Sequence, residues 1–297
     1  MKKRNSLIEL FRFIFAINVV QSHGLFIYSG QYFGHGRLSV EFFFILTGLL
    51  LVRSISKYIE QPFFKGFFSF FLTKLKGIFL PVLIAIPFNI AYCIVKDQSI
   101  NIFGYLWYVK QMLNYFAIFF IIRYFVKKEK IFILIISLIF AFTTIMNCFS
   151  VFYETGIVRA FMGISLGVLI SYIPKIKIKN QNLLWIINIP LMILTFLGLF
   201  FGANLFQEKI LQLIIYPALI YFTFQINIHN KFFNYLGALS FGLYAFQCVV
   251  RVFKETGYNN TWVLFGVILI LSIAEDGVRR IINYYQNKNK KIKTVSK

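Results

Sequence analysis

The sequence predicts an all-α protein, a polytopic transmembrane helical bundle of about ten spans with both termini in the cytoplasm. Three observations lead to this fold class: an apolar composition, a series of apolar runs of bilayer length, and basic residues gathered in alternate loops. Of the 297 residues, 59% are hydrophobic and 20% aromatic, whereas only 14% are charged. Soluble domains carry about 25% charged residues, so the composition excludes a water-soluble fold.

Ten apolar segments approach the length of about 20 residues that a helix needs to cross a bilayer. The first follows Met1–Arg4 in the manner of a signal peptide, but it contains Glu9 and Arg12 and lacks a small-residue cleavage site. We therefore expect it to be retained as a span. The expected spans are Leu7–Phe26, Leu38–Ile55, Leu75–Val95, Ile100–Phe125, Ile131–Cys148, Ile157–Ile173, Leu183–Phe201, Ile210–Ile226, Phe232–Phe253 and Trp262–Tyr284.

The formal net charge of +21 is explained by the loops in which the charges lie. Most of the 31 Lys and Arg residues precede the first span, occupy every second loop, or follow the last span. Cytoplasmic loops carry such an excess of basic residues, which places both termini inside and agrees with ten spans. The charge therefore gives no indication of nucleic-acid binding.

Two segments outside the spans are expected to lie at the cytoplasmic surface of the membrane. Gln61–Lys74 is rich in phenylalanine, bounded by lysines and too short to cross, which is typical of an interfacial segment. Asn287–Lys297 is a basic stretch, which we expect to be a disordered tail on anionic lipids. The chain is thus divided into a membrane domain, 1–285, and a basic cytoplasmic tail, 286–297.

The first span carries an arginine, Arg12, and a histidine, His23, eleven residues apart. At about 100° per residue they share one helix face, about 16 Å apart along the axis. A buried arginine in a bilayer faces other helices or water, so His23 lies on the same protein-facing stripe. Imidazole both removes and returns protons near neutral pH, which makes His23 a candidate catalytic base. Arg12 also has a possible ion-pair partner in Glu9, three residues earlier.

Glu41 opens the second span, at a depth similar to that of His23 because a short outer loop joins the two spans. A carboxylate there could orient the imidazole and stabilise its protonated form, as in a catalytic triad. Alternatively, Glu41 pairs with Arg37, four residues before it. The sequence does not decide between these two roles.

Other polar residues lie within or beside the spans. Arg37, Trp107, Lys110 and Arg159 are candidates for substrate binding, although Lys110 and Arg159 could instead extend to the membrane surface. The cysteines and histidines show no spacing typical of a disulfide framework or a metal site, so we expect neither.

Together these features resemble the acyltransferase-3 family of bacterial inner-membrane O-acyltransferases. The first span of that family has an arginine and, eleven residues later, a histidine, which match Arg12 and His23. Its second span begins with a Gly-Val-Asp-Phe-Phe-Phe-like block and ends with Ser-Gly-Phe-Leu. Val40–Leu50 looks like that pattern, with Glu41 in place of the aspartate and Thr47 in place of the serine.

The likeness continues over nearly the whole chain. Phe71–Pro81 is similar to a basic segment of the family that precedes a proline, with lysines in place of arginines and Gly77 at one basic position. Leu106–Val109, Arg159–Gly163 and Leu236–Phe246 also look like family blocks, although Gln247 stands where a histidine is often found.

The resemblance implies an enzyme that moves an acyl group, usually acetyl, from cytoplasmic acyl-CoA to a sugar hydroxyl of a lipid-linked or cell-surface glycan. Acetyl-CoA is then a co-substrate, and no permanently bound cofactor is expected. Lys74, Lys76 and the deeper Arg12 would bind the donor. His23, with Glu41 beside it, would act as general base on the acceptor hydroxyl or transiently carry the acyl group.

A second class of protein fits part of the pattern. A transporter or flippase for a lipid-linked or small amphipathic substrate would also have ten spans and buried cations. It would not require the spacing between Arg12 and His23, and retained export with lost acylation in a His23→Ala strain would separate the enzyme from the transporter. A structural or scaffolding membrane protein is a third class, and it would tolerate His23→Ala.

Overall fold

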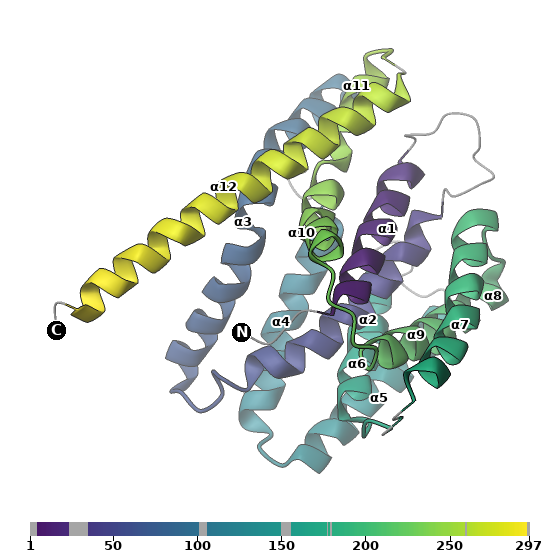
Figure 1. The fold of residues 1–297 in the computed structure, drawn as a ribbon, viewed down its shortest axis with the longest axis vertical. Helices are drawn as coiled ribbons and strands as arrows, with labels where there is room; N and C mark the ends of the chain where they lie inside the picture. The colour runs from purple at the N-terminus through teal and green to yellow at the C-terminus, as the bar shows by residue number, and fades with distance from the viewer. Residues whose placement is uncertain are drawn as a thin grey trace.

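The computed structural model describes residues 5–23, 35–100, 106–149, 156–176, 178, 180–258 and 260–295. All regular elements in these ranges are helical, which confirms the all-α class (Figure 1). In chain order they are α1 (Ser6–Ser22), α2 (Gly36–Ile55), α3 (Phe63–Val95), α4 (Trp107–Phe125), α5 (Glu129–Cys148), α6 (Ile157–Tyr172), α7 (Gln181–Phe201), α8 (Leu205–Ile210), the π-helical turn η2 (Leu211–Ile215), α9 (Tyr216–Thr223), α10 (Lys231–Ala245), α11 (Gln247–Glu255) and α12 (Thr261–Val295).

Within the described ranges, each of the ten expected spans overlaps one helix or consecutive helices; residues 24–26 of the first and 101–105 of the fourth lie outside those ranges. In the part of the chain that the structure describes, six segments are long and apolar enough to cross a membrane, namely α2, α3, α5, α7, Leu205–Thr223 and the first 26 residues of α12. A seventh is added if α10 and α11, bent by 41° at their junction, form one span. The remaining three expected spans do not reach that length and apolar character, for physical reasons. Helices α1 and α6 are shorter, and α4 carries Lys110, Gln111 and Asn114 in its first half.

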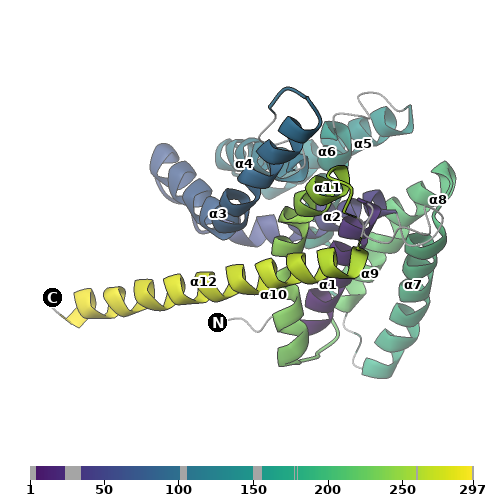
Figure 2. The same cartoon turned by 90° about the horizontal axis from the view of Figure 1, so that it is seen from above.

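Two expectations about the segments outside the spans are wrong. Gln61–Lys74 is not a separate interfacial segment, because α3 runs without a break from Phe63 to Val95. Phe70 is fully buried and packs its ring against Phe116 and Phe120 of α4, which holds this part of α3 in the bundle. The C-terminal stretch is not disordered in its described part, since α12 remains helical to Val295 and extends away from the bundle (Figure 2).

The centre of the bundle is built from α1, α2, α6 and α10. Phe15 of α1 stacks on Phe42 of α2 with ring centroids 4.0 Å apart. Between α2 and α6 the backbones touch: a Cβ atom added at Gly48 would lie 2.0 Å from the carbonyl oxygen of Ile164. Small residues permit such close helix packing in membranes. The contact therefore requires glycine at position 48.

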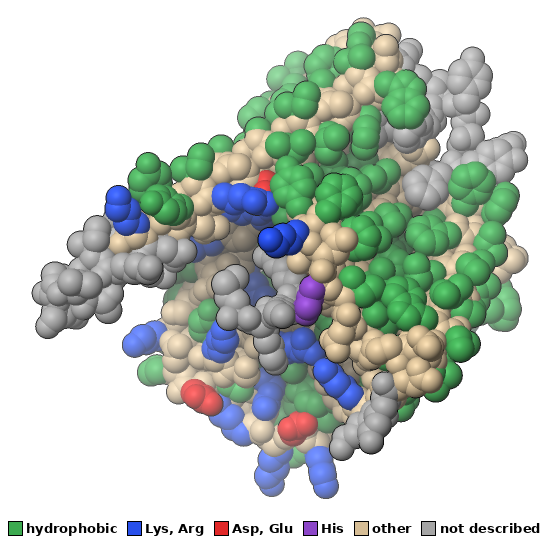
Figure 3. All heavy atoms as spheres, viewed as in Figure 1, with side chains coloured by type: hydrophobic (Ala, Val, Ile, Leu, Met, Phe, Trp, Pro, Cys, Tyr) green, Lys and Arg blue, Asp and Glu red, His purple; other side chains and the backbone are tan. Residues whose placement is uncertain are grey.

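The two ends of the bundle differ in character. At the end where α1 begins, the Asn5 side chain caps α1 and also donates to backbone carbonyls of Thr223 and Ile226. We call this end the basic end; Figure 3 shows Lys and Arg side chains gathered there, around a hollow below α12. At the opposite end Ser22 of α1 lies against Gly36 of α2. Helix α12 ends on the side where α1 begins (Figure 1).

Candidate active site

A cavity of about 770 Å³ lies between α1, α2, α3, α4, α10 and α12. Its lining on α2 extends from Leu50 to Val40, about 15 Å along the helix axis. The walls are mostly apolar and aromatic, and most of the charged groups belong to the first turn of α10 and the second half of α12. Its polar and charged residues are Arg12, Thr47, Tyr108, Lys231, Asn234, Tyr235, Ser240, Tyr244, Asp276, Arg279 and Arg280.

Arg12 lines this cavity from α1, and its side chain is 29% exposed. Its Nη1 donates to Glu9 Oε2 at 2.8 Å, so the predicted pair within the helix forms. Gly237 of α10 lies against that carboxylate, and a Cβ atom there would come within 2.1 Å of Glu9 Oε2. One donor of Arg12 is used by Glu9, and a guanidinium has five. Arg12 can therefore bind a ligand as well as Glu9.

At the basic end, two arginines of α12 share one carboxylate beside the cavity. Asp276 accepts hydrogen bonds from Arg279 Nη2 at 2.7 Å and from Arg280 Nε at 2.6 Å. The Arg280 guanidinium also lies over the ring of Tyr235, 5.3 Å from its centroid. With Lys231 these groups form a cationic mouth, which can bind an anion that competes with Asp276.

The sequence did not identify this mouth, because these cations also satisfy the positive-inside pattern. A signal was nevertheless present: an acidic residue, Asp276, stands three and four residues before two arginines at the end of a span. Such spacing pairs charges on one helix face.

The donor lysines predicted on α3 do not line the cavity, although Gly77 and Ile78 beside them do. Lys76 is exposed, because it lies about 200° around the helix from Ile78. Lys74 lies one turn nearer the basic end, with its ammonium over the rings of Phe70 and Phe116 at 5.5 and 5.1 Å. The structure therefore brings Arg12, but neither lysine, into the cavity.

A hydrogen bond joins α2 and α4 on the cavity wall. The Tyr108 hydroxyl and Thr47 Oγ1 lie 2.9 Å apart, and the Tyr108 ring meets that of Tyr244 edge to face at 5.5 Å. Thr47 belongs to the second-span block Val40–Leu50, where it stands in place of the family's serine. These contacts fix an aromatic wall between Arg12 and the opposite end.

His23 lies beyond the cavity, directly after the last residue of α1, where its backbone N–H donates to the Val20 carbonyl. Its side-chain contact is with Arg251 of α11, whose Nη2 meets His23 Nδ1. Arg251 was not identified from the sequence, because 228 residues separate it from His23.

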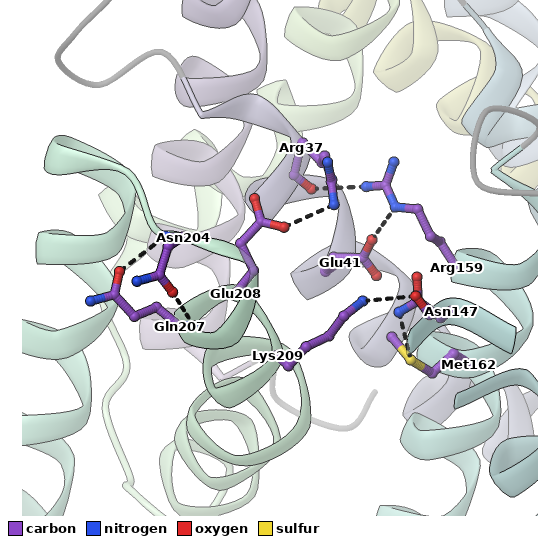
Figure 4. A network of polar contacts seen from close by, with 9 residues as sticks. All are labelled: Arg37, Glu41, Asn147, Arg159, Met162, Asn204, Gln207, Glu208 and Lys209. Atoms are coloured by element: carbon purple, nitrogen blue, oxygen red, sulfur yellow. Dashed lines mark hydrogen bonds and ion pairs between the residues drawn. The ribbon is translucent and has the colours of Figure 1, made fainter. Parts of the chain in front are cut away.

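Glu41 has a different partner from either one expected. Its Oε1 accepts from Arg159 Nε at 2.5 Å, while Arg159 Nη2 donates to the backbone carbonyl of Arg37 (Figure 4). The Arg37 side chain pairs with Glu208 at 2.8 Å, and Lys209 lies below them (Figure 4). The structure thus joins two predicted substrate-binding arginines to Glu41 in one polar cluster at the opposite end.

The other two candidates for substrate binding, Trp107 and Lys110, lie in different surroundings. Trp107 joins the cluster, with the Arg159 guanidinium 5.6 Å from its ring centroid, whereas Lys110 is exposed and does not line the cavity. Within the described ranges, three or more His, Cys, Asp or Glu side chains do not gather in a geometry suited to a metal ion.

In a comparison with known protein families, residues 5–274 match a family described as an acyltransferase domain. That range includes Arg12, His23, Glu41, Arg159 and Arg251, whereas Asp276, Arg279 and Arg280 of the cationic mouth follow it. Comparisons with curated proteins and with solved structures found no match.

Proposed function

The chain belongs to the acyltransferase-3 family, and we propose that it is an O-acetyltransferase of a bacterial inner membrane that acts on a sugar hydroxyl. The donor is cytoplasmic acetyl-CoA, and the acceptor is a lipid-linked or cell-surface glycan. The observation that carries this proposal is the placement of Arg12 and His23. One helix, α1, carries a cation inside a cavity near the basic end and an imidazole at the opposite end.

The topology follows from the same arrangement. The basic end faces the cytoplasm, because basic residues concentrate on that side of a membrane protein. All ten helical segments span the bilayer, including α1, α4 and α6. Much of each of these helices is packed inside the bundle, where Glu9 of α1, Gln111 of α4 and Arg159 of α6 are buried, so they need not be apolar on every face.

The cavity suits a CoA thioester in charge and shape. Its cationic mouth, formed by Lys231, Arg279 and Arg280, is matched to CoA phosphates, which arginine binds in a bidentate manner. The apolar and aromatic wall accommodates the pantetheine arm, and Arg12, deeper in the cavity, binds that arm while the thioester end extends toward His23. Lys74 and Lys76 contribute to the positive field at the entrance without direct contact.

In the simplest reaction His23 acts as general base. It takes the proton from the acceptor hydroxyl while the oxygen attacks the thioester carbonyl. A C–O bond forms, the C–S bond breaks, and the proton passes to the departing CoA thiolate. In a second route the imidazole nitrogen first carries the acyl group and then transfers it to the hydroxyl.

Glycan mass spectrometry in a deletion strain tests the proposal. The strain is complemented with the wild type, with His23→Ala, or with His229→Ala, which alters an exposed histidine at the basic end. We expect the acetyl group to return with the wild type and His229→Ala and to stay missing with His23→Ala. Loss of a general base lowers rates about 10²–10⁴-fold. Normal acetylation by His23→Ala, at wild-type abundance in the membrane, would overturn the assignment.

A further inference from the structure

Arg251 is held in a defined position beside His23. It belongs to α11, whose residues Cys248, Val249 and Val250 are fully buried in the core. The far end of this helix is fixed to α3 by a salt bridge of 2.6 Å between Glu255 and Lys96. The approach of the guanidinium to the imidazole is therefore set by the packing of α11.

The contact determines which imidazole nitrogen carries a proton. A guanidinium has five N–H donors and accepts no hydrogen bond. His23 Nδ1, which faces Arg251 Nη2, must therefore be the acceptor. A neutral imidazole with an accepting Nδ1 carries its proton on Nε2. The only basic nitrogen of His23 is thus the one that Arg251 occupies.

This arrangement conflicts with direct use of His23 as a base. Proton transfer to Nδ1, or acyl transfer to it, requires that Arg251 first withdraw. A protonated His23 beside Arg251 would also place two positive charges in contact, which disfavours the imidazolium form. Among the described residues at this end, Lys96 pairs with Glu255, Arg159 with Glu41 and Arg37 with Glu208, whereas Arg251 contacts the imidazole.

We propose that Arg251 is a positioning residue that keeps His23 in the Nε2–H form at rest and releases Nδ1 when an acceptor binds. The acceptor displaces the Arg251 guanidinium from Nδ1 because its own oxygen atoms accept the hydrogen bonds of the guanidinium instead. The hydroxyl, carboxylate or phosphate oxygens of a glycan can do this. Without an acceptor, Nδ1 stays blocked, and water cannot be activated to hydrolyse the donor. This inference rests on the proposed role of His23.

The first experiment measures transfer and donor hydrolysis with purified protein in lipid nanodiscs. Arg251→Gln removes the charge, and Lys254→Gln removes a neighbouring charge of the same helix as the matched control. We expect Arg251→Gln to release CoA from acetyl-CoA severalfold faster than the wild type when no acceptor is present. The acid limb of its pH–rate profile should move to higher pH, because the imidazolium no longer faces a cation. Lys254→Gln should behave as the wild type.

A second measurement uses the unaltered protein, so it holds even if Arg251→Gln fails to accumulate. ¹⁵N NMR of histidine-labelled protein, with His23→Ala for assignment, reports the tautomer directly. The Nε2–H form at neutral pH is expected, and the Nδ1–H form or the imidazolium would overturn the proposal.

The outcomes separate this inference from the proposed function. If transfer depends on His23 but Arg251→Gln changes neither hydrolysis nor the acid limb, the role of Arg251 is wrong and the function stands. If the wild type does not transfer the acetyl group, or if His23→Ala transfers it as well as the wild type does, the proposed function fails.

Discussion

Replacement of Arg159 by methionine should destabilise the protein strongly, because it leaves a buried carboxylate without its partner. Glu41 is 0% exposed and Arg159 is 7% exposed, and their side chains meet at 2.5 Å. Removal of one partner of a buried ion pair costs about 3–5 kcal/mol. At about 2 °C per kcal/mol for a large domain, Arg159→Met should lower Tm by about 6–10 °C.

Thermal unfolding in detergent, followed by the loss of the monodisperse peak in size-exclusion chromatography, measures this effect. Arg37→Met is the matched control, since the side chains of the Arg37–Glu208 pair are 32% and 14% exposed, against 9% and 1% for Arg159–Glu41, and the cost of breaking an ion pair falls with its exposure. The double variant Glu41→Gln with Arg159→Met removes both charges and should recover most of the loss, because neutral groups cost less to bury than an unpaired charge.

The reasoning is refuted if Arg159→Met and Arg37→Met unfold at the same temperature, or if the double variant is no more stable than Arg159→Met. The same series tests the other role considered for Glu41. If Glu41 orients His23, Glu41→Gln should retain its abundance and thermal stability while losing turnover. If the pair with Arg159 is its main role, Glu41→Gln should lose stability first.

Two further predictions concern the cavity and the helix packing. Isothermal titration with acetyl-CoA should show weaker binding for Arg280→Gln and tighter binding for Asp276→Asn, which removes the carboxylate that both arginines share, although Arg279 keeps its contacts with Glu275 and the Ala238 carbonyl. Lys76→Gln should differ from the wild type only at low salt. Weaker binding by Asp276→Asn would contradict the competition between Asp276 and the donor. Gly48→Ala should sharply reduce the amount of folded protein in the membrane, since its Cβ would overlap the α6 backbone. Gly266→Ala, which has open space around it, should accumulate normally. Equal accumulation of the two variants would contradict the packing argument.

The helices were predictable because a bilayer imposes a simple requirement on each of them. A run of about 20 apolar residues is needed wherever the chain crosses the hydrocarbon core, and this information is local in sequence. The error at Gln61–Lys74 has a matching cause. Phenylalanines between lysines suit both a membrane surface and a helix packed against α4, and only the contact of Phe70 with Phe116 and Phe120 decides between them.

The residues of the candidate site also divide into those that local sequence predicts and those that depend on contacts between distant helices. Arg12 was found because its place inside the bundle follows from the cost of a charge in lipid, and its relation to His23 follows from helix geometry alone. Both residues lie on α1, so their separation is fixed by the sequence. The cationic mouth and the partner of His23 come from α10, α11 and α12, more than 200 residues away, and no spacing rule reaches them.

The pairing of Glu41 shows why local spacing misleads in a membrane bundle. Arg37, four residues away, satisfies the rule for an ion pair on one helix face, yet Arg37 pairs with Glu208 and Glu41 with Arg159. In a soluble protein an unpaired surface charge is solvated by water at little cost. Inside a bundle each charge needs a protein partner, so charges from different helices join in one cluster. Arg12 does pair with Glu9 of its own helix, so the acids of neighbouring helices have to be considered beside those of the same helix.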